Sequence, residues 1–193
     1  MKEIAKYFYE IGQLKRVKRS GWWMVGIDNP ESVAEHSLRT AIIGYVLAYL
    51  EGADPFKTAA ICLFHDTHET RILDLHRVAK RYIHLGEDEE QARREQVARL
   101  PEPLADEIAT LMSYHEMQET PEGVLAHDAD ALECLIQARE YQTQGYTEVE
   151  DWIINCQAVL RSESAKNIAD ECLRVEPREW WQGLKQKMES KKA

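Results

Sequence analysis

The sequence predicts an all-α fold, and the spacing of its apolar residues supports this prediction. Apolar residues recur every three or four positions through most of the 193-residue chain, which is the period of a helix with one buried face. No segment alternates apolar and polar residues over the roughly five positions of a half-buried strand. Only 9 glycines and 6 prolines are present, so few positions interrupt a helix.

The first expected helix spans residues 2–17 and ends in a basic, glycine-containing loop over residues 15–28. Three later helices begin at one kind of capping sequence, in which a polar cap precedes proline: Asn29-Pro30, Asp54-Pro55 and Thr120-Pro121. These signals predict helices from about residue 30 to 50, 55 to 67 and 121 to 141. Further helices are expected near residues 87–99, 101–117, 147–161, 163–173 and 177–189, and the highly charged one at 87–99 should be largely solvated.

We expect one domain over residues 1–193. The length and the 44% hydrophobic content are sufficient for one buried core, and no low-complexity linker or internal repeat divides the chain. The longest strongly apolar run, residues 41–50, is too short for the ~20 residues of a membrane span, and the N-terminus is acidic where a secretory signal is not. The protein is therefore expected to be cytoplasmic, with no membrane partner.

Charge and cysteine content exclude two further classes of protein. The formal net charge of −10 argues against binding a nucleic-acid polymer, which needs a broad basic face. A small anionic substrate remains possible, because it needs only local positive charge. The four cysteines lie far apart, without the spacing of a zinc knuckle or a disulfide scaffold, and are expected to be reduced and buried.

Metal-capable side chains occur in unusually apolar surroundings. The hydrophobic run at residues 60–64 leads directly into His65 and Asp66. Taken alone, this pair is better explained as an ordinary helix end. However, His36 and Asp130 also lie on helices with apolar neighbours, and Asp130 has no basic residue within one helical turn. Four such side chains from three helices could hold a divalent cation inside a helical bundle.

The pattern His…His-Asp…Asp on helices resembles the HD-domain phosphohydrolase superfamily. Residues 14–22, 30–37, 65–69 and 119–122, the last leading to Asp130, resemble the HD-domain 5′-deoxynucleotidases, and the resemblance covers about residues 5–140. It implies a single-domain HD-type helical bundle with a central metal site, followed by C-terminal helices over 147–189. It also implies that one divalent transition metal ion is held by the following side chains: His36, His65, Asp66 and Asp130.

The same resemblance implies that Glu69 is the catalytic carboxylate. Glu69 follows His65 by four residues, so both would point toward the ion if the helix continued for one more turn. It would then orient a water molecule or exchange a proton with the leaving oxygen, and the sequence does not separate these roles. The alternative is that Glu69 forms an ordinary ion pair with Arg71 or caps a turn.

Substrate contacts are also implied by the resemblance. Arg19 matches an arginine near the substrate, whose guanidinium suits phosphate or sugar oxygens. Asp74 matches an aspartate that contacts the deoxyribose and helps to exclude ribose. Lys80 matches a lysine that meets the phosphate, but this chain departs from the usual proline-bearing connection there, so Arg77 is an alternative and a surface lysine another.

An aromatic partner for the substrate is expected in the loop after Arg19. Trp22 is the candidate and Trp23 the reserve, although a tryptophan here could equally be a lid on the core. His115 and His127 are not expected to bind a second metal, because they do not match the positions of the extra histidines in binuclear HD phosphodiesterases.

The expected function is hydrolysis of deoxyribonucleoside 5′-monophosphates to deoxynucleoside and phosphate. The ligand set suits manganese, cobalt, iron, nickel or zinc. One alternative is hydrolysis of another nucleotide at a phosphodiester or polyphosphate bond, which the small set of basic residues disfavours. A second is a non-catalytic assembly protein with a structural metal, which would not need Glu69. A homodimer is expected because relatives commonly pair, and the regions of Trp152 and Trp180-Trp181 could serve an interface or the core.

Overall fold

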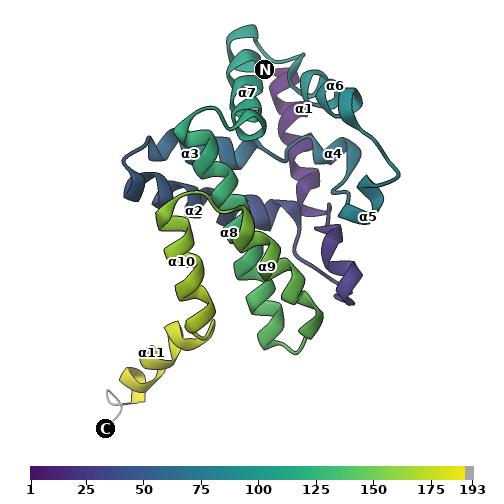
Figure 1. Cartoon of the computed structure of the whole chain (residues 1–193). Helices are drawn as coiled ribbons and strands as arrows, with labels where there is room; N and C mark the ends of the chain where they lie inside the picture. Colours follow the sequence, from purple (N-terminus) through teal and green to yellow (C-terminus); the bar gives the residue numbers. More distant parts are fainter. Residues whose placement is uncertain (190–193) are drawn as a thin grey trace.

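The computed structural model describes residues 1–189, and this part of the chain is helical, as predicted (Figure 1). Within it, the only β pairing is an isolated bridge between Lys18 and Ser32. The α-helices are α1 (Lys2–Ile11), α2 (Val33–Glu51), α3 (Pro55–Phe64), α4 (Glu69–Ile72), α5 (Arg77–Lys80), α6 (Gly86–Val97), α7 (Glu102–Met117), α8 (Pro121–Thr143), α9 (Glu150–Val159), α10 (Glu163–Arg174) and α11 (Glu179–Glu189).

Helix α8 is the centre of the bundle, and α2, α3, α9 and α10 pack against it (Figure 1). Its inner face contributes Leu125, Leu132 and Leu135, which are at most 4% exposed. These side chains join Leu47 of α2 and Ile61 of α3 in the main hydrophobic core. Because α8 is covered on several sides, a polar group on its inner face must find partners inside the protein.

A second, smaller core lies where α1, α6 and α7 meet, at the end of the molecule that carries the N-terminus (Figure 1). It contains Tyr7, Val97, Ile108 and Met112. The charged helix α6 exposes most of its residues to solvent, as its composition predicted, and contributes to this core through one face only. Ala92, Gln96 and Val97 are buried on one of its faces.

Two of the three predicted helix caps are confirmed. The Asp54 carboxylate accepts hydrogen bonds from the amides of Phe56 and Lys57, and the Thr120 hydroxyl accepts one from Gly123. The cap of α2 was predicted wrongly: it is Ser32, not Asn29.

Ser32 forms a capping box with Glu35, in which the Ser32 hydroxyl accepts from the Glu35 amide and the Glu35 carboxylate accepts from the Ser32 amide. Several other helix boundaries also differ from the predictions. The first helix ends at Ile11 and continues as a 3₁₀-helix, Gly12–Lys15. The predicted loop that follows contains another 3₁₀-helix, Ser20–Val25, and α5 was not predicted.

Helix α3 stops at Phe64 rather than at residue 67, and tight turns connect it to α4. A 3₁₀-helix, Thr147–Val149, precedes α9. All four cysteines are free thiols: Cys62 is buried, whereas the other three are partly buried. In residues 1–189, none of the helices combines the length and the apolar composition that a membrane crossing requires.

Candidate metal centre and active site

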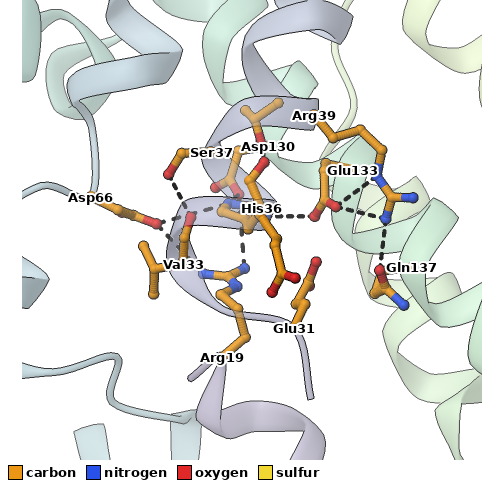
Figure 2. A network of polar contacts seen from close by, with 12 residues as sticks. Arg19, Glu31, Val33, His36, Ser37, Arg39, Asp66, Asp130, Glu133 and Gln137 are labelled. Carbon is orange, nitrogen blue, oxygen red and sulfur yellow. Dashed lines mark hydrogen bonds and ion pairs between the residues drawn. The ribbon is translucent and has the colours of Figure 1, made fainter. Parts of the chain in front are cut away.

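The four predicted ligands lie together, although they come from three separate helical regions. His36 projects from the first turns of α2, and Asp130 lies in the middle of α8 (Figure 2). His65 and Asp66 directly follow α3. The Nε2 atom of His36 is 3.1 Å from Asp130 Oδ1 and 3.8 Å from Asp66 Oδ2. The Nε2 atom of His65 is 3.0 Å from Asp66 Oδ2.

Both imidazoles are oriented to offer a lone pair to a cation. His36 Nδ1 lies 2.5 Å from Glu133 Oε2, and His65 Nδ1 lies 2.6 Å from the Cys62 carbonyl oxygen. Because each Nδ1 faces an acceptor, it carries the proton and leaves Nε2 unprotonated in the neutral ring. Both Nε2 atoms are buried and make no hydrogen bond within residues 1–189, although carboxylate oxygens lie beside them. This donor set fits a divalent metal ion.

Glu133 is a member of the site that the sequence did not reveal. Its side chain is fully buried on α8, and besides contacting His36 it accepts a hydrogen bond from Arg39 Nε at 2.9 Å (Figure 2). Arg39 in turn donates to Gln137 and Glu140 on the same helix. The arginine therefore compensates the buried carboxylate, which can then fix the ring of His36.

The two carboxylates of the predicted ligand cluster are held in their charged forms. Burial opposes ionisation of Asp66 and Asp130, but the neighbouring histidines and Arg19 outweigh it and hold both pKa values well below the ordinary range. Burial also lowers the pKa of His36, yet the carboxylates of Glu133 and Asp130 raise it to about 10. These opposite shifts show that positive charge is strongly favoured at the centre of the cluster.

Arg19 supplies part of that positive charge. Its guanidinium lies 3.6 Å from Asp66 Oδ2, 3.5 Å from Asp74 Oδ2 and 4.0 Å from Asp130 Oδ1. Arg19 directly precedes the 3₁₀-helix Ser20–Val25. The Ser20 hydroxyl donates a hydrogen bond to the Asp74 carbonyl oxygen and so connects this segment to Asp74. Arg19 therefore forms ion pairs both with the ligand cluster and with Asp74.

A cavity of about 650 Å³ opens beside this cluster. All the predicted catalytic and substrate-contacting side chains line it: Arg19, Trp22, Glu69, Asp74 and Lys80. Arg77 lines it too, so both alternatives for the phosphate contact are present on α5. Arg93 of α6 is a further basic residue in the wall, but Glu89 and Glu116 already pair with its charge.

Glu69 is placed at the first residue of α4 and is only 7% exposed. The turn after α3, rather than a continuing α-helix, brings it to the cavity. Burial, together with the negative charges of Asp66 and Asp74, raises the pKa of Glu69 to about 9. In the metal-free chain this carboxyl group therefore holds a proton near neutral pH.

Trp22 forms part of the core as well as the cavity wall. Its indole is 2% exposed, donates from Nε1 to Glu31 Oε1 at 3.1 Å, and packs against Tyr141 and Trp152. Trp23, the reserve candidate, is 52% exposed. Trp152 therefore belongs to the core, whereas Trp180 is exposed.

Two histidines outside the predicted ligand set also reach the centre. His115 of α7 lies with its ring centroid 4.7 Å from that of His65, and His127 of α8 lies beside it. His68 is buried, lines the cavity and contacts Glu89 through Nε2 at 3.1 Å. No spacing rule linked His115 to His65, because the contact depends on how α7 packs against α3.

A family model described as "HD domain" matches residues 11–171, which include every residue of the cluster. The chain belongs to the HD domain family. Its sequence is 31% identical over 145 residues to a 5′-deoxynucleotidase of Danio rerio, covering 74% of this chain and 71% of the relative. It is 28% identical over 155 residues to a 5′-deoxynucleotidase of Erwinia tasmaniensis, covering 75% and 77%.

This HD-domain chain also has a similar solved structure. A conserved hypothetical protein from Pyrococcus furiosus superposes with a TM-score of 0.73 at 31% identity, covering 89% of this chain and 99% of the other. The all-α HD fold expected from the motif pattern is thereby confirmed.

Proposed function

We propose that this chain is a metal-dependent phosphomonoesterase that hydrolyses deoxyribonucleoside 5′-monophosphates to deoxynucleoside and phosphate. One observation carries the proposal: a cluster of two imidazoles and two carboxylates suited to a divalent cation adjoins a cavity that contains a buried carboxyl group, Glu69, and the Arg19 guanidinium. Relatives named 5′-deoxynucleotidases in animals and bacteria support the same substrate class.

His36, His65, Asp66 and Asp130 would hold the ion. When bound, the ion supplies Lewis acidity at the phosphate and lowers the pKa of water. We assign the metal to the group of manganese, cobalt, iron, nickel and zinc, because mixed imidazole and carboxylate ligands suit these ions.

The chain's own residues would position the nucleotide. Arg19 faces the cavity from beside the cluster, so it can neutralise a phosphate oxygen, and Lys80 or Arg77 can approach from α5. Asp74 pairs with Arg19 and lines the cavity, so its carboxylate can contact the sugar and disfavour a 2′-hydroxyl. Trp22 forms the adjoining apolar wall.

Glu69 would supply the proton that the leaving oxygen needs. Its carboxyl group is buried at the cavity beside the ligand cluster, and a proton delivered from it to the leaving 5′-oxygen would assist cleavage. Orientation of the attacking water is the alternative role. Either role requires Glu69 to contact the reacting atoms, whereas a structural metal site would not require it.

The proposal is tested by removing metals with a chelator, restoring them singly and measuring phosphate release from matched deoxyribo- and ribonucleoside monophosphates. We expect release from the deoxy substrates with at least one ion of the group. Equal rates on both sugars would remove Asp74 from its selective role. No release with any ion would favour the non-enzymatic alternative, and faster cleavage of phosphodiesters or triphosphates would favour another nucleotide.

A Glu69→Gln variant separates catalysis from metal binding. The amide keeps the size of the side chain but cannot exchange the proton, so turnover should fall by roughly 100-fold or more while metal affinity changes little. Glu119→Gln, which alters an exposed acid before α8, provides a matched control. Turnover preserved in Glu69→Gln would exclude the assigned role.

We further propose that the chain forms a homodimer through an exposed apolar face on α2 and α3. On α2, Leu38, Ile42, Tyr45 and Tyr49 follow one another at helical spacing and are 39–73% exposed, and Phe56 of α3 is 76% exposed. Contiguous apolar surface of this kind is typical of a protein interface. A second copy can cover it symmetrically.

A further inference from the structure

His115 is placed beside the metal centre without a partner of its own. Its side chain is 13% exposed, and its buried Nε2 atom makes no hydrogen bond within residues 1–189. That atom lies 3.8 Å from Asp130 Oδ2. An imidazole nitrogen that is removed from water usually has a hydrogen-bond partner or a metal, so the orientation of His115 requires an explanation.

Asp130 presents its two oxygens to different histidines. Oδ1 lies 3.1 Å from His36 Nε2, whereas Oδ2 faces His115 Nε2. Helix α7 approaches α8 closely at Gly123, where a Cβ atom would clash with the Tyr114 carbonyl oxygen. The approach of His115 is thus a consequence of close packing between two helices.

Within residues 1–189, two overlapping groups of possible ligand atoms contain His65. In the first, atoms of His36, His65 and Asp66 all lie within 4.8 Å of one another, and in the second the same holds for His65, His115 and Asp130. With metal–ligand bonds of ~2.1 Å, two ligand atoms are ~3 Å apart when adjacent and ~4.2 Å apart when opposite. Both groups are therefore close to the size of one coordination shell.

The shared residue limits the number of ions. His65 Nδ1 is bonded to the Cys62 carbonyl oxygen, so only Nε2 is available as a ligand. An imidazole nitrogen has one lone pair and binds one metal ion at a time. Because His65 can offer only Nε2 to either group, the groups describe two sides of one shell rather than two separate sites.

We propose that His115 is a further ligand of this one ion, so that the shell contains three imidazoles and two carboxylates. The inference rests on the metal centre of the proposed function and extends its ligand set to a fourth helix. Imidazole favours iron, cobalt, nickel and zinc, whereas an oxygen-rich shell favours manganese and magnesium. His115 therefore biases the centre toward the former ions.

The test uses Co²⁺ added to the full-length, metal-free protein, with its visible absorption bands reporting the ligand set. A competing chromophoric chelator gives the affinities for Co²⁺ and Mn²⁺. We expect His115→Gln to change the Co²⁺ bands and to weaken Co²⁺ binding on the order of 10-fold or more, with a smaller loss for Mn²⁺. His127→Gln is the matched control, because this neighbouring ring belongs to neither group of ligand atoms. His115→Asp, which restores a ligand of another type, should recover part of the affinity.

Unchanged Co²⁺ bands and affinity in a folded His115→Gln protein would overturn the proposal. Binding of two ions per wild-type chain would also overturn it, in favour of separate sites. If the wild-type protein binds no metal, the proposed centre itself fails, and the role of His115 with it. Wild-type binding with equal losses in the His115→Gln and His127→Gln variants would indicate a general disturbance of the cavity and would likewise contradict a specific ligand role.

Discussion

At the scale of single residues, the chemistry of the centre depends on which nitrogen of each histidine carries the proton. For His36 this is decided by Glu133, a fully buried carboxylate whose negative charge Arg39 balances. Ligands oriented in this way bind metal more tightly than free imidazole, because the correct tautomer and ring position exist before binding.

We predict that Glu133→Gln weakens metal affinity by roughly 10–100-fold, since the amide can still accept a hydrogen bond but no longer carries the charge that favours cation binding. Competition with a metal chelator measures this change. Glu140→Gln is the control, because Glu140 contacts Arg39 at the outer end of the same network and does not touch His36. A similar loss in both variants would show that the network acts on folding rather than on His36.

Glu31 gives a prediction about the pH dependence of stability in the metal-free protein. Burial, and then the charge of Glu133, raises its pKa from 4.5 to about 7. Between pH 4.5 and 7 the unfolded chain therefore releases a proton that the folded chain retains, so this residue makes the free energy of unfolding fall as pH rises through that window.

Glu31→Gln should remove this loss while leaving an acceptor for the Trp22 indole. We expect the variant to exceed the wild type by roughly 1–3 kcal/mol in unfolding free energy above pH 7 and to gain little below pH 4.5. Urea unfolding at the two pH values measures the difference. An equal gain at both would mean that the substitution acts through packing and not through charge.

The four side chains of the cluster could be singled out from the sequence because each stands out from its own neighbours, as His65 and Asp66 do after an apolar run. The sequence did not single out Glu133, and His115 was considered only as a ligand of a second metal and rejected. The contacts of both residues join parts far apart in the chain. Glu133 follows Asp130 by three residues and resembles an ordinary helical acid until α2 is packed against α8. Contacts between side chains on different helices therefore cannot be predicted from local sequence patterns.

At the scale of helices, capping signals located most of the starts but misplaced that of α2. Asn29, Pro30 and Ser32 all suit a helix start, and the capping box chooses Ser32, because its hydroxyl and Glu35 satisfy one another's amides. The ends were harder to predict: α3 stops at Phe64, and tight turns rather than a continuing helix carry His65 and Asp66.

The choice between the two caps can be measured. We predict that Ser32→Ala lowers the free energy of unfolding by about 1 kcal/mol, because the Glu35 amide loses its acceptor at a buried helix end. Asn29→Ala is the paired control and should change stability by only a few tenths of a kcal/mol. Thermal denaturation of both variants measures the two changes in stability. A greater loss of stability in Asn29→Ala than in Ser32→Ala would show that Asn29, as the sequence suggested, is the cap of α2.

At the scale of the whole molecule, α2 has apolar side chains on both its inner and outer faces. The inner face packs on α3 and α8, whereas Leu38 and Ile42 on the outer face are 61% and 59% exposed. A helix that is apolar all round is usually buried all round. The periodicity of the sequence shows that α2 is a helix, but it does not show whether this chain or a second copy covers the outer face.

We predict that Ile42→Lys converts a dimer into monomers. In a twofold interface the substitution would bury a lysine of each copy close to the other, and desolvation and repulsion should weaken association by about 100-fold or more. Sedimentation equilibrium at several protein concentrations measures the change. Tyr9→Lys, at an 80% exposed position on α1 outside this face, is the control and should leave the dimer intact. A wild-type protein that stays monomeric at the highest concentration, or an Ile42→Lys variant that stays dimeric, would exclude the α2 face as the interface.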